Sequence, residues 1–345
     1  PWYNTETLES GAGGGESSPG LSGTDPVFVG NTTTVQIAVT RPSGAPLTER
    51  PPGNTPTTPG LGYLPATAEQ PLAQNISAVL ISPPLAPADT QWTPPTAVIA
   101  PGQPPNIIGR SHWGADELVR CHDRPYHEGI HAAVVHHTAE SNDYTPEDSA
   151  AIVQSIYAYH TRTLGWCDIA YNALVDKYGQ VFEGRAGGIN EPVEGDHAGG
   201  FNRGTWGVAM IGNFDDVAPT PIQLRTVGRL LGWRLGMDRV DPHGTVTLVS
   251  DGGPYTNFPT GAAATLPTIF SHRDVGNTDC PGNAAYPLLD EIRDVAARFN
   301  SPPGPEDLAM SLQGGAIYAR WQAMGGMNSV LGAPTSPEAT GAGSV

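Results

Sequence analysis

The sequence predicts an α/β domain in which helices cover the faces of a β-sheet. Two observations lead to this prediction. Between residues 106 and 300, short segments with strand periodicity alternate with longer segments whose apolar residues recur at helical spacing. Capping residues and prolines mark where the helices begin. Because strands interleaved with helices are typical of sheets covered by helices, we expect one such domain in this part of the chain.

The alternation of apolar and polar residues places the first half of the domain. Strands are expected at residues 131–138, 169–176, 180–185 and 206–213. A helix is expected between the first two strands, over residues 146–163. Thr145 is its predicted N-cap, and Pro146 its first helical residue.

Two further helices are expected in the second half of the domain. One begins after Thr220, where Gln223 three residues later completes a capping-box pattern. The other begins at Pro287 and carries apolar residues on one face. Residues 241–267 lie between the two helices and are expected to form a loop or hairpin insertion.

The flanking segments differ from this domain in composition. Residues 1–105 hold 19 of the 35 prolines. Within them, residues 26–40 resemble two strands around a Gly-Asn turn, so we expect residues 1–40 to be a β-rich remnant of an upstream domain. An isolated hairpin is the alternative. Residues 41–105 cannot bury enough apolar surface for a core and are predicted to be an extended linker. Residues 306–345 are predicted to be one member of a repeat array, because so small a unit barely supports its own core.

Charge and hydrophobicity exclude two classes of partner. The formal net charge of -17 argues against nucleic acid. No apolar run approaches the ~20 residues that a membrane span needs, so no span is expected.

The three cysteines are Cys121, Cys167 and Cys280. In a secreted protein this odd count indicates either a thiol outside any bridge or a cysteine with another task.

Two histidines and a cysteine form a candidate metal site. His136 and His137 lie near the end of an apolar strand, where successive side chains point to opposite faces, so one should face the open end of the site and the other should face packing or solvent. His272 and Cys280 are eight residues apart, a spacing that one loop can bring to a single ion. Two imidazoles and a thiolate suit zinc and leave a fourth position for water. Taken singly, each residue is more often a buried core residue.

Five segments in this order resemble the peptidoglycan recognition proteins and the related N-acetylmuramoyl-L-alanine amidases, including phage zinc amidases. They are VVHHTA (134–139), YHTRTLGWCDIAYNALV (159–175), GQVFEGRAGG (179–188), DHAGGFNRGTWGVAMIGNF (196–214) and SHRDVGNTDCPG (271–282). The resemblance covers about residues 107–299. It implies a central mixed β-sheet flanked by helices, and zinc-dependent hydrolysis of the amide between the lactyl group of muramic acid and L-alanine in peptidoglycan.

The resemblance also implies roles for particular residues. His136, His272 and Cys280 would hold Zn²⁺, and the hydroxyl of Tyr171 would help to hold the oxyanion of the tetrahedral intermediate. Thr278 is a second catalytic candidate. It stands where the phage enzymes have lysine and where active animal members commonly have threonine. An uncharged hydroxyl offers one hydrogen bond but does not supply the charge of the lysine.

Substrate binding and a disulfide follow from the same resemblance. His197, Asn202 and Arg203 match the segment that lines the muropeptide groove in the family. Many secreted members link cysteines at the positions of Cys121 and Cys167, which leaves the third cysteine for zinc. Such a bridge would stabilise the fold by about 4 kcal/mol on the chain-entropy model, and it implies export to an oxidising compartment.

The C-terminal segment resembles a different family. Residues 314–338 are similar to the LGFP repeat of actinobacterial envelope proteins, although Ala333 departs from that pattern. This similarity implies anchoring to the cell wall. We therefore expect a secreted, cell-envelope protein whose partner is peptidoglycan, acting as a monomer.

Two other functions compete with that of a zinc amidase. The first is a recognition module that binds muropeptides without cutting them. Family members of that kind typically lack the metal-binding cysteine, which is present here as Cys280. The second is a wall-tethered structural protein with a vestigial groove. Measured turnover of peptidoglycan separates the amidase from both.

Overall fold

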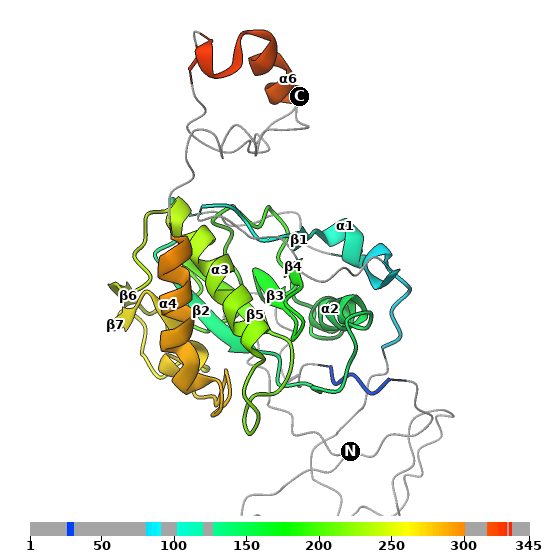
Figure 1. Cartoon of the computed structure of the whole chain (residues 1–345). Helices are drawn as coiled ribbons and strands as arrows, with labels where there is room; N and C mark the ends of the chain where they lie inside the picture. Colours follow the sequence, from blue (N-terminus) through cyan, green and yellow to red (C-terminus); the bar gives the residue numbers. More distant parts are fainter. Residues whose placement is uncertain are drawn as a thin grey trace, which may run out of the picture.

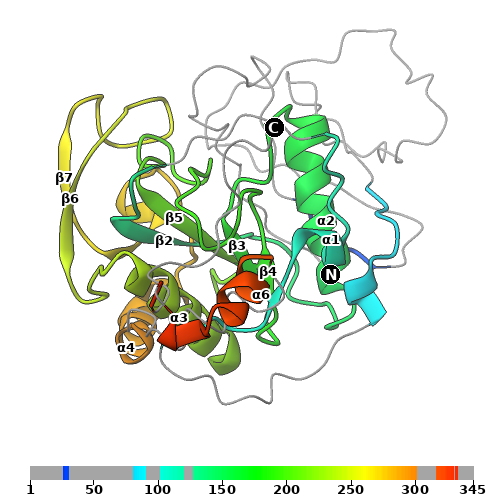
Figure 2. The same ribbon diagram turned by 90° about the horizontal axis from the view of Figure 1, so that it is seen from above.

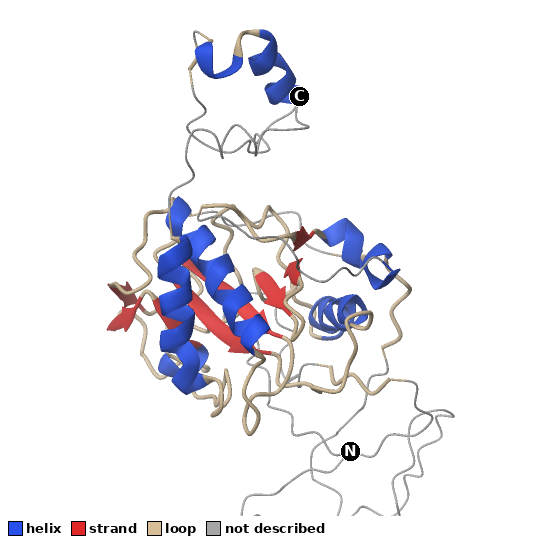
Figure 3. Ribbon diagram, viewed as in Figure 1, coloured by secondary structure: helices blue, strands red, loops and turns tan. Residues whose placement is uncertain are grey.

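The computed structural model describes residues 26–30, 81–90, 102–119, 127–300, 316–329 and 331–332, with only the backbone of 316 and 317. Within these residues a six-stranded sheet has the order β1-β4-β3-β5-β2-β8. Its strands are β1 (Ile107–Ile108), β2 (Ala132–His137), β3 (Ala173–Val175), β4 (Val181–Glu183), β5 (Thr205–Met210) and β8 (Ile269–Ser271). All neighbouring strands run parallel except β3 and β4, which are antiparallel. The predicted mixed central sheet is confirmed (Figures 1 and 3).

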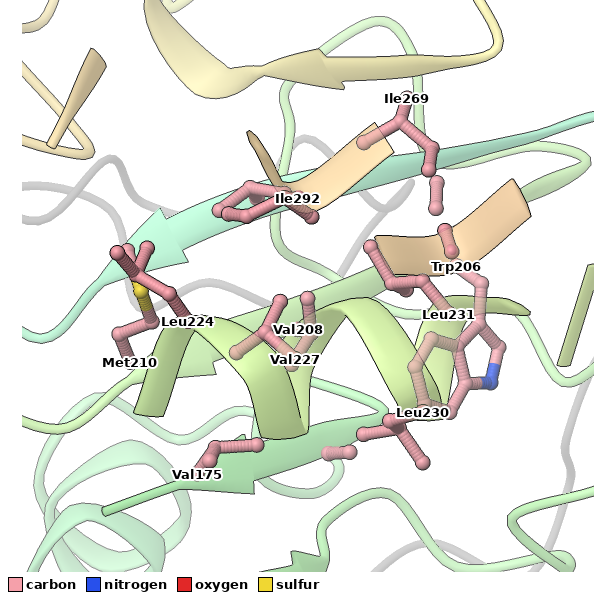
Figure 4. Packing of buried hydrophobic residues seen from close by; sticks show 14 of the residues in the cluster. Val175, Trp206, Val208, Met210, Leu224, Val227, Leu230, Leu231, Ile269 and Ile292 are labelled. Atoms are coloured by element: carbon pink, nitrogen blue, oxygen red, sulfur yellow. The ribbon is translucent and has the colours of Figure 1, made fainter. Parts of the chain in front are cut away.

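One face of the sheet packs against two long helices, α3 (Pro221–Met237) and α4 (Leu289–Phe299). Alternate side chains of β5, namely Trp206, Val208 and Met210, point to this side and are fully buried. Val227 and Leu231 of α3 pack onto them (Figure 4). This apolar layer is the largest core of the domain, and it carries no candidate metal ligand.

The opposite face of the sheet is covered in two separate places. Helices α1 (Arg110–Trp113) and α2 (Ser149–Ala158) cover the β3–β4 part through an apolar cluster that includes Trp113 and Leu174. The hairpin β6 (Thr245–Val249) and β7 (Ala263–Pro267) covers the β2–β8 part through Leu248, Leu266 and Phe270. Figure 2 shows α2 and this hairpin at opposite ends of the sheet. The hairpin is the insertion expected at 241–267.

The start of the first predicted helix is wrong. The helix α2 begins at Ser149 with Asp148 as its N-cap residue, and a π-helical segment, η2 (Tyr159–Thr163), continues it. Thr145 does not cap the helix. Its backbone N–H and its hydroxyl both donate to Oδ2 of Asp148, at 2.7 and 2.9 Å. The backbone N–H of Asp148 donates to the carbonyl of Thr145 at 3.1 Å, so residues 145–148 form a turn before the helix.

The other two helix starts lie close to their predicted positions. Thr220 caps α3, and its hydroxyl oxygen accepts the N–H of Gln223 at 3.2 Å. The Gln223 side chain does not complete the capping box; it donates instead to the carbonyls of Val175 and Ile211. Before α4, the short 3-10 helix η4 (Tyr286–Leu288) contains the predicted start, and the α-helix begins one turn later.

Part of the segment predicted as a linker lies against the domain. The 3-10 helix η1 (Pro87–Thr90) contacts α1 and α2, and Ala86 and Ala88 are buried in the same apolar cluster as Trp113. The side-chain amide of Gln154 on α2 donates to the carbonyl of Pro84 at 3.2 Å. Residues 31–80 and 91–101 lie outside the described residues, as does most of the hairpin predicted at 26–40. The domain limits stay a prediction.

The C-terminal unit is described only in part. It contains α6 (Ala316–Ala323) and the 3-10 turn η5 (Gly326–Asn328). Trp321 is buried, and its indole N–H donates to the carbonyl of Gly332 at 2.9 Å. The repeat resemblance stays a prediction, because residues 333–338 lie outside the described part. None of the helices in the described residues has both the length and the apolar character of a membrane span.

Close packing of α3 on α4 gives a first testable prediction. A Cβ added at Gly228 would lie 2.5 Å from Cβ of Val295 and 3.0 Å from the carbonyl oxygen of Ile292. Intrinsic helix propensity favours alanine over glycine by about 1 kcal/mol. Overpacking opposes this gain, and we expect Gly228→Ala to lower the free energy of unfolding by about 1–3 kcal/mol in urea titrations.

The double variant Gly228→Ala/Val295→Ala tests the reason. Shortening Val295 keeps its Cβ but removes its Cγ1, which would lie 2.7 Å from the added Cβ, so the two substitutions together should destabilise less than the sum of their separate effects. Additive effects would show that the helices part without a specific contact between these two positions.

Candidate metal centre

The end of β2 separates two adjacent histidines onto opposite faces of the sheet. His137 lies on the α3–α4 side, where its Nδ1 accepts the backbone N–H of Phe214 at 3.3 Å. His136 lies on the other face, between the parts of the sheet that α2 and the β6–β7 hairpin cover. Both rings are buried. The two rings therefore lie on opposite faces of the sheet, as the strand pattern predicts, and His137 faces packing and not solvent.

The second histidine of the site begins a short helix at the end of β8. In η3 (His272–Asp274), Ser271 is the N-cap, and both its backbone N–H and its hydroxyl donate to Oδ2 of Asp274 at 2.8 Å. This capping box turns the chain sharply after the strand. It places the ring of His272 with its centroid 4.7 Å from that of His136.

The loop that carries Cys280 is held against the short helix η3 and the end of β2 by hydrogen bonds. The backbone N–H of Arg273 donates to the carbonyl of Cys280 at 3.0 Å, and the guanidinium donates to Oδ1 of Asn283 at 2.9 Å. The N–H of Cys280 donates to the hydroxyl of Thr278 at 3.1 Å. Sγ of Cys280 in turn accepts the backbone N–H of His137 at 3.4 Å. These contacts direct the thiol to the end of β2.

The three predicted ligands therefore meet. The ligand atoms of His136, His272 and Cys280 all lie within 4.8 Å of one another, and all three residues are buried. Sγ of Cys280 is 3.7 Å from Nδ1 of His136. A tetrahedral zinc with bonds of about 2.0–2.3 Å would space its ligand atoms about 3.5 Å apart. Two imidazoles, one thiolate and this spacing fit zinc.

The protonation state of His136 also fits a metal ligand. Burial lowers the pKa of His136 well below its usual value, and the neighbouring rings of His272, His197 and His137 lower the pKa further. The ring is therefore neutral at neutral pH. A neutral imidazole has a lone pair on one ring nitrogen, which is the form that binds a metal.

Tyr171 lies beside the cluster. Its side chain is buried, and its ring centroid is 5.4 Å from that of His136. The backbone carbonyl of Tyr171 accepts the N–H of Arg185 at 2.8 Å, which holds the residue just before β3. His160 also packs against Tyr171, with a centroid separation of 6.1 Å. The ring of Tyr171 therefore lies against one of the candidate zinc ligands.

The three predicted groove residues lie in different surroundings. His197 is buried, and its Nδ1 is 3.1 Å from Nε2 of His136. Asn202 is also buried, and its Oδ1 accepts the N–H of Ala198 at 2.8 Å, which closes the loop. Arg203 has a side chain that is 69% exposed and lies 3.6 Å from a carboxylate oxygen of Asp251. Their roles toward a muropeptide stay predictions.

The electrostatics around His197 favour its neutral form. Burial, together with the nearby His272 and Arg185, lowers the pKa of His197 to about 3. Arg185 itself is ion-paired with Asp196. A neutral His197 can act as a hydrogen-bond acceptor toward His136.

One residue of the site was not predicted from the sequence, and one predicted bond lies partly outside the described residues. Sequence reasoning missed Arg273, because its contacts with Cys280 and Asn283 form only when the loop folds back. The predicted disulfide between Cys121 and Cys167 stays a prediction, because Cys121 lies outside the described residues.

Comparison with known proteins shows the family to which this chain belongs. Residues 125–283 match the family model described as N-acetylmuramoyl-L-alanine amidase. The chain is 31% identical over 187 residues to peptidoglycan-recognition protein SC2 of Drosophila melanogaster, over 54% of this chain and 84% of the relative. The chain belongs to the peptidoglycan recognition protein and amidase family.

Other relatives come from this family as well. Peptidoglycan recognition protein 1 of Mus musculus is 32% identical over 184 residues, which are 53% of this chain and 85% of the mouse protein. The solved structure of the N-acetylmuramoyl-L-alanine amidase LysC from Clostridium intestinale has 23% identity and a TM-score of 0.39. That alignment covers 55% of this chain and 96% of LysC. Residues 1–60 match a separate model, described as Rv3811 N-terminal galactose-binding domain-like.

Proposed function

We propose that this protein is a zinc-dependent N-acetylmuramoyl-L-alanine amidase of the cell envelope. The observation that carries the proposal is the convergence of His136, His272 and Cys280, in a chain of the amidase family, on one buried cluster that suits zinc. Its substrate would be the amide between the lactyl group of muramic acid and the L-alanine of the stem peptide.

The residues of the site would have different roles in amide hydrolysis. His136, His272 and Cys280 would hold the ion. When bound, zinc supplies a water of lowered pKa and polarises the amide carbonyl. Tyr171 would donate its hydroxyl to the oxygen that becomes negative as the amide carbon turns tetrahedral. Burial of these groups keeps bulk water away and strengthens that hydrogen bond.

The segment with His197, Asn202 and Arg203 would line the groove that holds the muropeptide. Arg203 is the exposed member of the three predicted groove residues, and its guanidinium can pair with a carboxylate of the stem peptide. Thr278 lies next to Cys280 and already accepts its N–H, so its hydroxyl can serve the loop as well as the substrate. Binding to peptidoglycan would bring the protein to the cell envelope.

Digestion of purified peptidoglycan tests the proposal. The zinc-loaded protein should release stem peptides with a new L-alanine amine, read by mass spectrometry, and should leave the glycan strands uncut. A chelator should stop the release, and added zinc should restore it, because the water is activated only at the metal. Peptidoglycan that is bound but uncut after long incubation with zinc would make the protein a recognition module.

A further inference from the structure

We propose that His197 is a positioning residue for the metal centre: its Nδ1 accepts the Nε2–H of His136 and so sets the tautomer and the orientation of that ligand. The inference rests on the proposed zinc site. It gives His197 a task different from lining the muropeptide groove.

The two ring nitrogens of His136 face different partners. Nδ1 lies 3.7 Å from Sγ of Cys280, and Nε2 lies 3.1 Å from Nδ1 of His197. The nitrogen that faces the thiol must give its lone pair to the ion. In a neutral imidazole the other nitrogen then carries the hydrogen. Nδ1 of His197 must therefore accept, and the hydrogen of the His197 ring belongs on its own Nε2.

Two glycines, Gly195 and Gly207, form a narrow space that the ring of His197 fills. A Cβ added at Gly207 would lie 2.4 Å from Cγ of His197, and one added at Gly195 would lie 2.5 Å from Cδ2 of His197. Gly207 pairs with Val134 across β2 and β5, so its bare face is on the same side of the sheet as His136. Even a methyl group at either glycine would push the ring of His197 out of its position.

The walls of this narrow space are themselves tied together. Asn172 accepts the N–H of Gly207 at 2.8 Å through its Oδ1, and donates from Nδ2 to the carbonyl of Val193 at 2.9 Å. The N–H of Asp196 donates to the carbonyl of Ala170 at 3.0 Å. The segment that leads into His197 is thus held against β3 and β5, and the ring reaches His136 without freedom to turn.

His197 is much less exposed than Arg203, the predicted groove residue that reaches solvent. His197 is 5% exposed, whereas the side chain of Arg203 is 69% exposed. Ligand histidines in metal sites commonly donate their second N–H to a fixed acceptor, and loss of that acceptor costs about 10–100-fold in metal affinity. The acceptor here is a second imidazole.

Zinc affinity of two variants tests the inference. His197→Phe fills the narrow space but removes the acceptor, whereas the Oδ1 of His197→Asn can occupy the place of Nδ1. Competition with a coloured chelator should show zinc affinity about 10–100-fold weaker for the phenylalanine variant and within about threefold of the wild type for asparagine. Thermal melts of the metal-free proteins should show that both variants fold. The absorption of bound Co²⁺ should change for phenylalanine only, because its His136 ring can turn.

A measurement on the wild type does not depend on either variant folding. Long-range ¹⁵N–¹H spectra of the zinc-loaded protein should show both His136 and His197 as Nε2–H tautomers. An Nδ1–H tautomer at His197, or equal zinc affinity of the wild type and His197→Phe, would overturn this inference and leave the amidase proposal intact. A wild type that binds no zinc would overturn the proposed function, and this inference with it.

Discussion

Replacing Cys280 by serine should remove the metal and lower amidase turnover by at least about 10³-fold, because activation of water and polarisation of the carbonyl are lost together. A serine hydroxyl is not ionised at neutral pH and is a much poorer zinc ligand than a thiolate. Zinc affinity should therefore fall by more than the ~10–100-fold that loss of an outer contact costs. Metal analysis and peptidoglycan digestion measure the two effects.

The fold should survive this substitution. The serine hydroxyl can still accept the N–H of His137 that Sγ accepts in the wild type. His243→Ala is a matched control, because His243 is a half-exposed histidine paired with Asp294 outside the metal cluster. The control should keep both zinc and turnover. A Cys280→Ser protein that folds and still cuts peptidoglycan at the wild-type rate would refute the proposed ligand set.

Removing only the hydroxyl of Tyr171 should reduce kcat by about 10²–10³-fold, which is the usual cost of losing one oxyanion donor. The substitution Tyr171→Phe keeps the ring, which packs 5.4 Å from that of His136. Because the hydrogen bond strengthens as charge develops on the substrate oxygen, KM should change little. Steady-state kinetics on soluble muropeptides separates kcat from KM.

A second tyrosine provides the control for this experiment. The hydroxyl of Tyr178 donates to the carbonyl of Tyr144 at 2.8 Å, away from the metal cluster. Tyr178→Phe should cost about 1 kcal/mol of stability and leave kcat unchanged. Zinc content of Tyr171→Phe should equal that of the wild type. A rise in KM with unchanged kcat would assign Tyr171 to substrate binding instead of to oxyanion stabilisation.

Some features of the fold could be predicted from the sequence because their causes are local. The strand pattern around His136 and His137 predicted opposite faces, and the contact of His137 with Phe214 shows the packed side. The cap at Thr220 was predicted from the residue itself. The start of α2 was not, because Thr145 and Pro146 form a local helix signal, whereas residues 145–148 form a separate turn before the helix.

The residue types available for zinc and the elements that carry them could be predicted from the sequence, because periodicity, capping and ligand chemistry depend on neighbours along the chain. Tertiary contacts alone set which nitrogen of His136 faces the thiol and which faces His197, a residue 61 positions away. That choice depends on the register of β2 against β5 and on the missing side chain of Gly207. Contacts of this kind arise when distant strands pair, and no local pattern encodes them.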